Sequence, residues 1–188
     1  EYADTLTLSM GIESSELSFK AALFQRHDDD LVDWTYSHSA PSLRQANPVN
    51  LDVTGLELIA SWQTQLLDVI AAFTALDKDE DYGTAAVDAS YYALNYARQR
   101  YTLAMIYRPV QSLEVRLDNE YRQQQENSLR AGSDYAYLGA FSLSWRTPWV
   151  QPLWLSLIAD NIADSDFQEF PGTPAVGRQF SLNAALDW

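Results

Sequence analysis

Few residues in this chain are suited to covalent chemistry, because histidine is scarce and cysteine is absent. The only imidazoles belong to His27 and His38. Neither has a carboxylate at a spacing typical of acid–base catalysis, and no serine lies in the context of a nucleophile elbow. The lack of cysteine also excludes a disulfide framework and a thiolate metal site. The sequence therefore predicts no catalytic residue and no enzyme.

Acidic residues are the candidates for metal binding. Asp77, Asp79, Glu80 and Asp81 fall close together. Calcium prefers carboxylate oxygens, so Asp77, Asp79 and Asp81 are candidate calcium ligands in an external loop. The glycine and the final bidentate glutamate of an EF-hand are missing, and a solvated acidic loop is the simpler interpretation. The same holds for the aspartates at 28–30, and no other cofactor is expected.

Ring-bearing residues are the candidates for ligand binding. Five of them fall in two stretches that we expect to be loops, namely Trp34, Tyr36, His38, Tyr91 and Tyr92. Loops carry binding function more often than the elements that they connect. These residues are therefore candidate substrate-binding residues in external loops. The alternative is that they anchor the loops at an interface or pack against one another.

An alternation of charged and uncharged residues indicates which kind of element surrounds these candidates. The charged residues, which we call the lumen set, occupy even positions: Glu114, Arg116, Asp118, Glu120 and Arg122. The uncharged residues occupy odd positions: Leu113, Val115, Leu117, Asn119 and Tyr121. Side chains alternate between the two faces of a strand, whereas a helix would spread these charges around its circumference. We expect a strand with one apolar face and one charged face.

Such a strand fits either a soluble sandwich or a membrane barrel. A sandwich buries the apolar face in a core, and a barrel turns it to lipid while the charged face lines a wet lumen. Similar alternation recurs along the chain and predicts roughly nine strands of about ten residues, the length that a tilted membrane strand needs. The segments are 6–12, 17–23, 56–62, 67–74, 101–107, 113–122, 135–146, 153–160 and 180–188.

The expected connections also alternate. Short ones fall near 13–16, 63–65, 109–111 and 147–151, and long ones near 28–50, 77–96, 126–134 and 161–177. An antiparallel meander places every short turn at one end and every long loop at the other. This asymmetry is typical of transmembrane barrels, whereas a sandwich mixes turn lengths at both ends.

Composition and the placement of aromatic residues favour the barrel. Mean hydropathy is −0.27, and no apolar run is long enough for a membrane helix. These two facts exclude a helical membrane protein but not a barrel, because a barrel strand alternates apolar and polar residues. Most tryptophans fall near the short turns: Trp62, Trp145, Trp149, Trp154 and Trp188. Many tyrosines fall near the long loops, as two aromatic belts at two membrane interfaces would require; ordinary strand residues are the alternative. A net charge of −14 without a basic stripe excludes nucleic-acid binding.

The end of the chain carries the most specific motif. Asn161-Ile162-Ala163-Asp164 precedes a Phe- and Pro-containing stretch at 167–174, then Gly177-Arg178, then an alternating strand that ends in Trp188. This resembles the C-terminal end of a TonB-dependent outer-membrane receptor. In that family an Asn-Leu-x-Asp-like strand exit leads through a last loop to Gly-Arg and to a final strand with a terminal aromatic residue. The segments 52–57 and 119–122 resemble strands of the same family.

The resemblance implies an all-β fold: an antiparallel transmembrane β-barrel meander that is the C-terminal part of a barrel of about 22 strands. Residues 1–188 would be this portion of the outer-membrane barrel, without the plug domain and the earlier strands. An odd number of strands with two open edges likewise predicts a piece of a larger barrel. The expected location is the bacterial outer membrane.

The resemblance also implies a function, namely a receptor that imports a scarce nutrient such as siderophore-bound iron, cobalamin or a glycan into the periplasm. The partners would be outer-membrane lipid and lipopolysaccharide, the plug domain and remaining barrel strands, and the barrel-assembly machinery. The TonB complex would act through an N-terminus outside this sequence, and no nucleic acid is involved. The alternatives are a passive porin-like channel and, less favoured, an outer-membrane barrel enzyme.

Two sets of residues gain a role from the resemblance. The lumen set would face the plug and form hydrogen bonds with it, and the alternative is a hydrated wall with cross-strand ion pairs. A second set on the final strand would form the signal that the barrel-assembly machinery reads: Phe180, Leu182, Leu186 and Trp188. The alternative for Trp188 is a residue of the interfacial belt.

Overall fold

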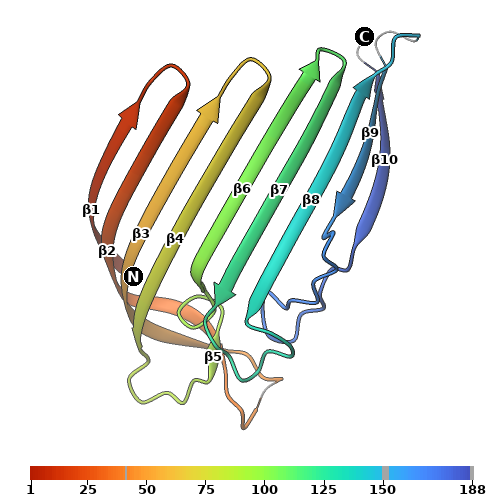
Figure 1. Cartoon of the computed structure of the whole chain (residues 1–188). Coiled ribbons are helices and arrows are strands. Elements are labelled where there is room, and N and C mark those ends of the chain that lie inside the picture. Colours follow the sequence, from red (N-terminus) through yellow and green to blue (C-terminus); the bar gives the residue numbers. More distant parts are fainter. Residues whose placement is uncertain (41, 150–152, 187–188) are drawn as a thin grey trace.

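The computed structural model describes residues 1–40, 42–149 and 153–186, which form one antiparallel sheet (Figure 1). Its strands are β1 (Tyr2–Glu13), β2 (Leu17–Tyr36), β3 (Gln45–Gln63), β4 (Leu67–Asp81), β5 (Ala89–Ser90), β6 (Ala97–Val110), β7 (Leu113–Gln124), β8 (Tyr135–Arg146), β9 (Leu153–Asp160) and β10 (Gln179–Leu186). Apart from β5, which pairs with β2, each strand lies beside its neighbours in sequence. Among the described residues, no helix is long and apolar enough to cross a membrane. The predicted all-β meander is confirmed.

Connections of different length lie at opposite ends of the sheet, as predicted. The short connections 14–16, 64–66 and 111–112 lie at the top in Figure 1. The longer connections lie at the bottom, which we call the long-loop end: 37–44, 82–96, 125–134 and 161–178. Every loop that carries a candidate binding residue is therefore at the same end of the molecule.

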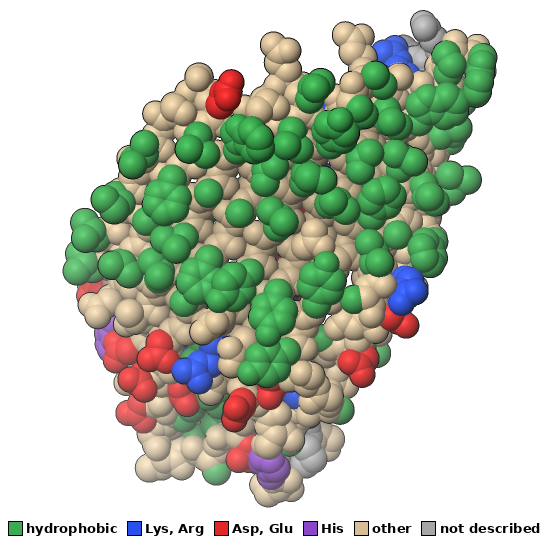
Figure 2. Space-filling model, viewed as in Figure 1, with side chains coloured by type: hydrophobic (Ala, Val, Ile, Leu, Met, Phe, Trp, Pro, Cys, Tyr) green, Lys and Arg blue, Asp and Glu red, His purple; other side chains and the backbone are tan. Residues whose placement is uncertain are grey.

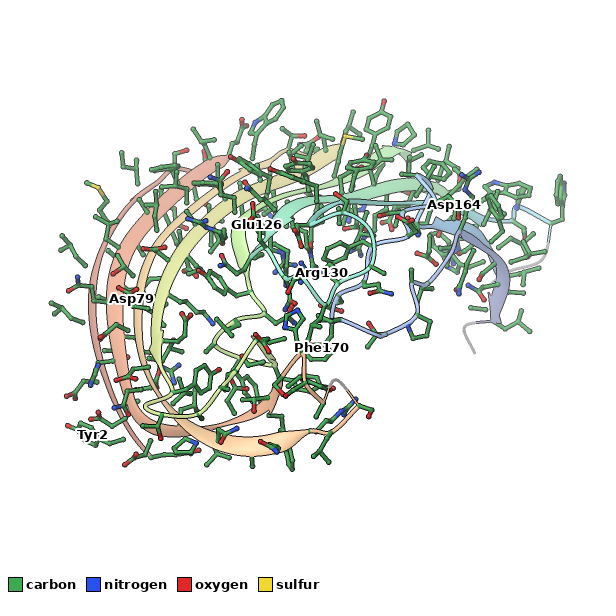
Figure 3. The ribbon with its side chains drawn as sticks, turned by 90° about the horizontal axis from the view of Figure 1, so that it is seen from below. Tyr2, Asp79, Glu126, Arg130, Asp164 and Phe170 are labelled. Atoms are coloured by element: carbon green, nitrogen blue, oxygen red, sulfur yellow. The ribbon has the colours of Figure 1, made fainter. Side chains whose placement is uncertain are left out.

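The sheet curls into a trough that stays open along one side, with β1 and β10 at its two edges (Figure 3). Every described residue of these two strands is exposed. An edge strand presents unpaired backbone N–H and C=O groups, and these groups need a partner strand where lipid excludes water. The two free edges agree with the expectation that the chain is a piece of a larger barrel.

Strand register places apolar and polar residues on opposite faces of the trough. Leu117 lies opposite Phe141, whereas Arg116 lies opposite Ser142. The apolar residues form a broad band on the convex face (Figure 2), and Arg116 and Lys20 belong to the concave face. Turning such a cation to the middle of a bilayer would cost about 2–4 kcal/mol. A slip by one residue would move both cations onto the apolar convex face, where a bilayer would impose this penalty.

The tryptophan belt at the short-turn end is confirmed in part. Trp62 and Trp145 lie on the convex face, and the ring of Trp149 meets the ring of Trp145 edge to face at 5.1 Å. Trp154 pairs with residues of the concave face, because Leu153 and Leu155 take the convex positions of β9. Trp188 lies outside the described residues.

Two expected loops are shorter than predicted, because three strands continue beyond the apolar band. The connections expected at 28–50 and 77–96 are loops only at 37–44 and 82–96. A β-bulge between Asp28 and Leu31, with Asp30 at a φ of 53°, accommodates the extra residues of β2. The pairing of β2 with β3 then resumes at Leu31. These strand ends lie beyond the apolar band, and the aspartates at 28–30 therefore do not end β2.

The buried core lies on the concave side at the long-loop end, where the 82–96 loop folds back onto β3. Val49, Leu51 and Val53 of β3 pack with Ala93 of that loop. Arg130 of the 125–134 loop and Phe170 of the 161–178 loop also lie inside the trough (Figure 3). Three long loops therefore fold into the trough and fill its mouth.

Candidate ligand-binding site

Three rings from separate segments meet in the mouth of the trough. Tyr91 and Phe170 stack with parallel planes (1°) and ring centroids 3.8 Å apart. The ring of Tyr36 lies 5.4 Å from that of Phe170, and the Tyr36 hydroxyl donates to the Tyr91 hydroxyl at 3.3 Å. Tyr36 ends β2, Tyr91 follows β5, and Phe170 belongs to the 161–178 loop. Two of the five predicted binding residues are thus brought together.

Arg44 adds a positive charge to these rings. Its guanidinium carbon lies 5.6 Å from the ring centroid of Tyr36 and 5.3 Å from that of Tyr91. Contacts of this kind are worth about 0.5–1 kcal/mol at an exposed site. No carboxylate of the described residues lies within ion-pair distance of Arg44. We call Tyr36, Arg44, Tyr91 and Phe170 the mouth cluster.

Two cavities border the mouth cluster, and Phe170 lines both of them. The smaller has a volume of about 160 Å³ and is lined by Tyr36, Leu129, Phe170, Pro171 and Gly172. The larger has a volume of about 640 Å³ and extends from Tyr91 and Phe170 down to Arg122 on the concave wall. A ligand-sized space with aromatic walls and a few polar groups is typical of a binding site for a small molecule.

Asp33 of β2 holds the 82–96 loop in place. Its carboxylate is fully buried and accepts hydrogen bonds from the Tyr82 hydroxyl at 2.7 Å and from three backbone N–H groups at 3.1–3.2 Å. Those N–H groups belong to Tyr91, Tyr92 and Ala93. Burial raises the pKa of the Tyr82 phenol above its usual value, so this group stays protonated and donates to Asp33.

Arg130 joins three of the long loops. Its side chain is fully buried and forms an ion pair with Asp134. It also donates to the Gln168 carbonyl at 3.1 Å and to the Asn95 side chain at 3.0 Å, and its guanidinium lies 5.5 Å from the ring centroid of Phe167. Removing one partner of a buried ion pair costs about 3–5 kcal/mol, so Arg130 fixes the loops that surround Phe170.

The other predicted binding residues lie around the mouth cluster rather than in it. The His38 ring contacts Asp88 at 3.0 Å and Ser128 at 3.0 Å, so it links three loops. The backbone N–H and the ring of His38 lower the pKa of Asp88. Tyr92 is about half exposed, and its carbonyl accepts a bond from Lys78. Trp34 is about half exposed, on the face of β2 opposite Asp33.

The lumen set lies on the concave face, and each member has an ion-pair partner. Glu120 bridges Arg122 and Arg100 of β6, and Arg116 pairs with Asp118 at 2.6 Å. Glu114 pairs with Arg108 at 2.9 Å, and Arg122 also reaches Glu169 of the 161–178 loop at 3.4 Å. These contacts make a wall of ion pairs on the concave face. A contact with a plug stays a prediction.

The proposed calcium ligands lie on a strand and not in a loop. Asp77, Asp79 and Asp81 alternate along β4, so their side chains share one face. In the part of the chain that the structure describes, no three or more His, Asp or Glu side chains are grouped as a metal site would need. The calcium site stays a prediction. Of the other aspartates, Asp28 is buried beside Arg26, and Asp29 contacts His27.

The predicted assembly signal falls on the edge strand β10. Phe180, Leu182 and Leu186 pair with Ala159, Leu157 and Leu153 of β9 on the convex face. Their side chains are among the most exposed apolar groups of the chain. The fourth member, Trp188, lies outside the described residues. Recognition by the barrel-assembly machinery stays a prediction.

Sequence reasoning missed several residues that build the site. Arg44 and Asp33 fell within the expected 28–50 loop, and Arg130 carried no motif. Phe170 belonged to the C-terminal motif but was not a candidate for binding. The one available signal was the pair Phe167 and Phe170, since apolar rings in a long polar loop need a partner in the folded protein.

Known proteins resemble the chain in structure rather than in sequence. No protein-family model matches the chain, and no curated protein matches it in sequence. The FrpB iron transporter from Neisseria meningitidis superposes with a TM-score of 0.70 at 17% identity, over 97% of this chain and 30% of that one. The siderophore receptor PiuA from Acinetobacter baumannii gives 0.68 at 18% identity, over 97% and 28%.

The ferric-catecholate import receptor Fiu from E. coli K12 gives a TM-score of 0.64 at 18% identity, over 97% of this chain and 27% of that one. The chain thus spans less than a third of each of these proteins. Identities this low establish the fold alone. The resemblance drawn from the sequence is confirmed at that level: the chain has the fold of part of the β-barrel of TonB-dependent receptors.

Proposed function

We propose that the chain is part of an outer-membrane receptor that binds a scarce nutrient at its external loops and imports it into the periplasm. The observation that carries this proposal is the mouth cluster, in which rings from three segments and one cation meet beside cavities of about 160 and 640 Å³. The fold supports the proposal, because several proteins with this fold are iron transporters or siderophore receptors.

Each part of the trough has a different partner in this proposal. The apolar convex band faces lipid and lipopolysaccharide, and the concave wall with its ion pairs faces water and a plug domain. The edges of β1 and β10 pair with the remaining strands of the barrel. The TonB complex supplies energy through an N-terminal segment outside this sequence, and the barrel-assembly machinery inserts the protein.

The substrate is an iron chelate in this proposal. Among the proteins with this fold, FrpB is an iron transporter, PiuA is a siderophore receptor and Fiu is an import receptor for ferric catecholates. The mouth cluster offers rings for stacking and a guanidinium for an anionic group, which are the contacts that an organic iron chelate can use. In this proposal the ligand crosses the barrel chemically unchanged.

Uptake of labelled iron tests the proposal. The full-length protein, expressed in a Gram-negative host that lacks its own iron receptors, is supplied with ⁵⁵Fe as citrate and as a catecholate complex. We expect uptake of one complex, its loss on deletion of TonB, and at least a tenfold decrease with Tyr91→Ala plus Phe170→Ala. Ile162→Ala, an exposed position of the same loop as Phe170, is the control. Uptake that survives deletion of TonB would indicate a passive channel instead.

A further inference from the structure

We infer that His27 is a pH-sensitive clamp, which in its protonated form holds the β-bulge of β2 against β3 just beyond the apolar band. The inference goes beyond the proposed function, because it concerns the order of the strand ends and depends neither on the ligand nor on transport.

Both ring nitrogens of His27 face a carboxylate. Nδ1 lies 2.7 Å from a carboxylate oxygen of Asp52 on β3, and Nε2 lies 3.0 Å from one of Asp29 on β2. A neutral imidazole has one N–H donor and one acceptor nitrogen, whereas an ionised carboxylate only accepts hydrogen bonds. The ring can therefore donate to both carboxylates only as the imidazolium ion, with a proton on each nitrogen.

These two contacts join neighbouring strands at the bulge. Asp52 lies directly opposite His27 in the pairing of β2 with β3, whereas Asp29 falls in the bulge, outside that pairing. Asp30, the other bulge residue, donates its backbone N–H to the Asn50 side chain of β3 at 3.0 Å. Side chains therefore hold the bulge against β3, and the ring of His27 is one of them.

His27 also lies within a row of carboxylates on the convex face. Asp4 of β1 lies opposite His27, and Asp79 of β4 lies opposite Asp52. Acidic side chains gather beyond the apolar band over these strands (Figure 2). The Tyr2 hydroxyl donates to Asp4 at 2.9 Å but brings no charge. When the imidazolium loses its proton, these three carboxylates are left side by side without a cation among them, and like charges at opposite positions destabilise a sheet.

The nearest guanidiniums are engaged elsewhere. Arg26 precedes His27 in the sequence but points to the concave face, where it pairs with Asp28 at 2.6 Å. Arg98 of β6 lies 4.0 Å from Asp77 of β4, and β3 separates that strand from β2. Neither cation takes the place of the imidazolium between Asp29 and Asp52.

The direction of the pH effect follows from the contacts of the ring. The hydrogen bond with Asp52, and next that with Asp29, raise the pKa of His27 above its usual 6.5. The contribution of the clamp is therefore complete below pH 6.5 and is lost as the pH rises through the raised pKa. β2 continues from the bulge to Asp33 and Tyr36, so the clamp lies at the base of the segment that positions the mouth cluster.

The pKa of His27 is measured first, on the full-length protein in detergent. Exchange of the imidazole C2 proton for deuterium, followed by mass spectrometry of the peptides, reports each histidine separately. We expect a pKa above 6.5, and a decrease in Asp52→Asn at least three times that in Asp4→Asn, which removes a carboxylate opposite the ring. A wild-type pKa at or below 6.5, or an equal effect of the two variants, would overturn the inference.

Exchange of the backbone amides then tests whether the ring holds the bulge. Rates at pH 6 and pH 9 are corrected for the intrinsic pH dependence of exchange, and the amides of 113–122 are the internal reference. We expect the protection of 29–32 to fall at least fivefold between the two pH values in the wild type. In His27→Gln the protection should be low at both. An equal fall in His27→Gln and in the wild type would overturn the inference.

Discussion

The ring of Tyr91 lies flat on the ring of Phe170, with centroids 3.8 Å apart and planes parallel within 1°. Four strands separate the two residues in sequence, since Tyr91 precedes β6 and Phe170 follows β9. Their contact ties two long loops to each other across the mouth of the trough. The two loops therefore form one surface, and a substitution that loosens one loop should also loosen the other.

Replacing Phe170 by alanine should loosen both loops. Phe170 is buried, and truncating a buried phenylalanine costs about 3–5 kcal/mol where the surroundings do not collapse. Hydrogen–deuterium exchange should rise in 161–178 and also in 82–96. The exposed Ile162→Ala serves as the control. Faster exchange in 161–178 alone would show that the stack does not couple the loops.

Replacing Asp33 by asparagine should release the 82–96 loop while leaving β2 paired. The carboxylate accepts four hydrogen bonds, and an amide has a single acceptor oxygen. Leaving buried N–H groups unsatisfied costs about 1–3 kcal/mol. The amides of Tyr91, Tyr92 and Ala93 should exchange at least tenfold faster. Asp30→Asn, at an exposed site where asparagine tolerates the positive φ, is the matched control.

Protection of those amides that is unchanged in Asp33→Asn would show that the pairing of Ser90 with Thr35 holds the loop without help from the carboxylate.

The Tyr82 phenol should make the same loop sensitive to alkaline pH. Its pKa is raised above the usual 10.0, chiefly by burial and in part by the hydrogen bond to Asp33. A raised pKa in the folded state means that the neutral phenol stabilises the loop fully below pH 10 and that this contribution is lost as the pH rises through the folded pKa. Spectrophotometric titration of the wild type minus Tyr82→Phe should show a phenol that ionises only above pH 10. Ionisation at or below pH 10 would contradict the burial of this group.

Strand register was predictable from the sequence because it is a local property. Each alternating segment determines its own faces, and Leu117 and Arg116 fall on the sides that the period of two requires. The placement of short and long connections at opposite ends was predictable too, because the same alternation locates the ends of the strands. The broad fold therefore needed no knowledge of long-range contacts.

The mouth cluster could not be predicted in the same way. The bulge at Asp30 lets β2 continue to Tyr36 through a stretch that looks like a polar loop, and this continuation brings Asp33 beneath the 82–96 loop. The partners of Phe170 and Arg130 lie many residues away, on other loops. Such contacts depend on how the loops fold into the trough, and alternation carries no information about that.

The most direct test of the account is whether the convex face meets lipid and the concave face meets water. The chain has no cysteine, so single cysteines at each position of 113–122 in the full-length protein can carry a spin label in lipid vesicles. Collision with oxygen, which concentrates in lipid, and with a water-soluble nickel chelate is then measured by electron paramagnetic resonance. We predict an alternation of period two, with oxygen favoured at Val115 and Leu117 on the convex side and the nickel chelate favoured at Arg116. Equal access to both reagents along the strand would contradict a membrane-spanning barrel.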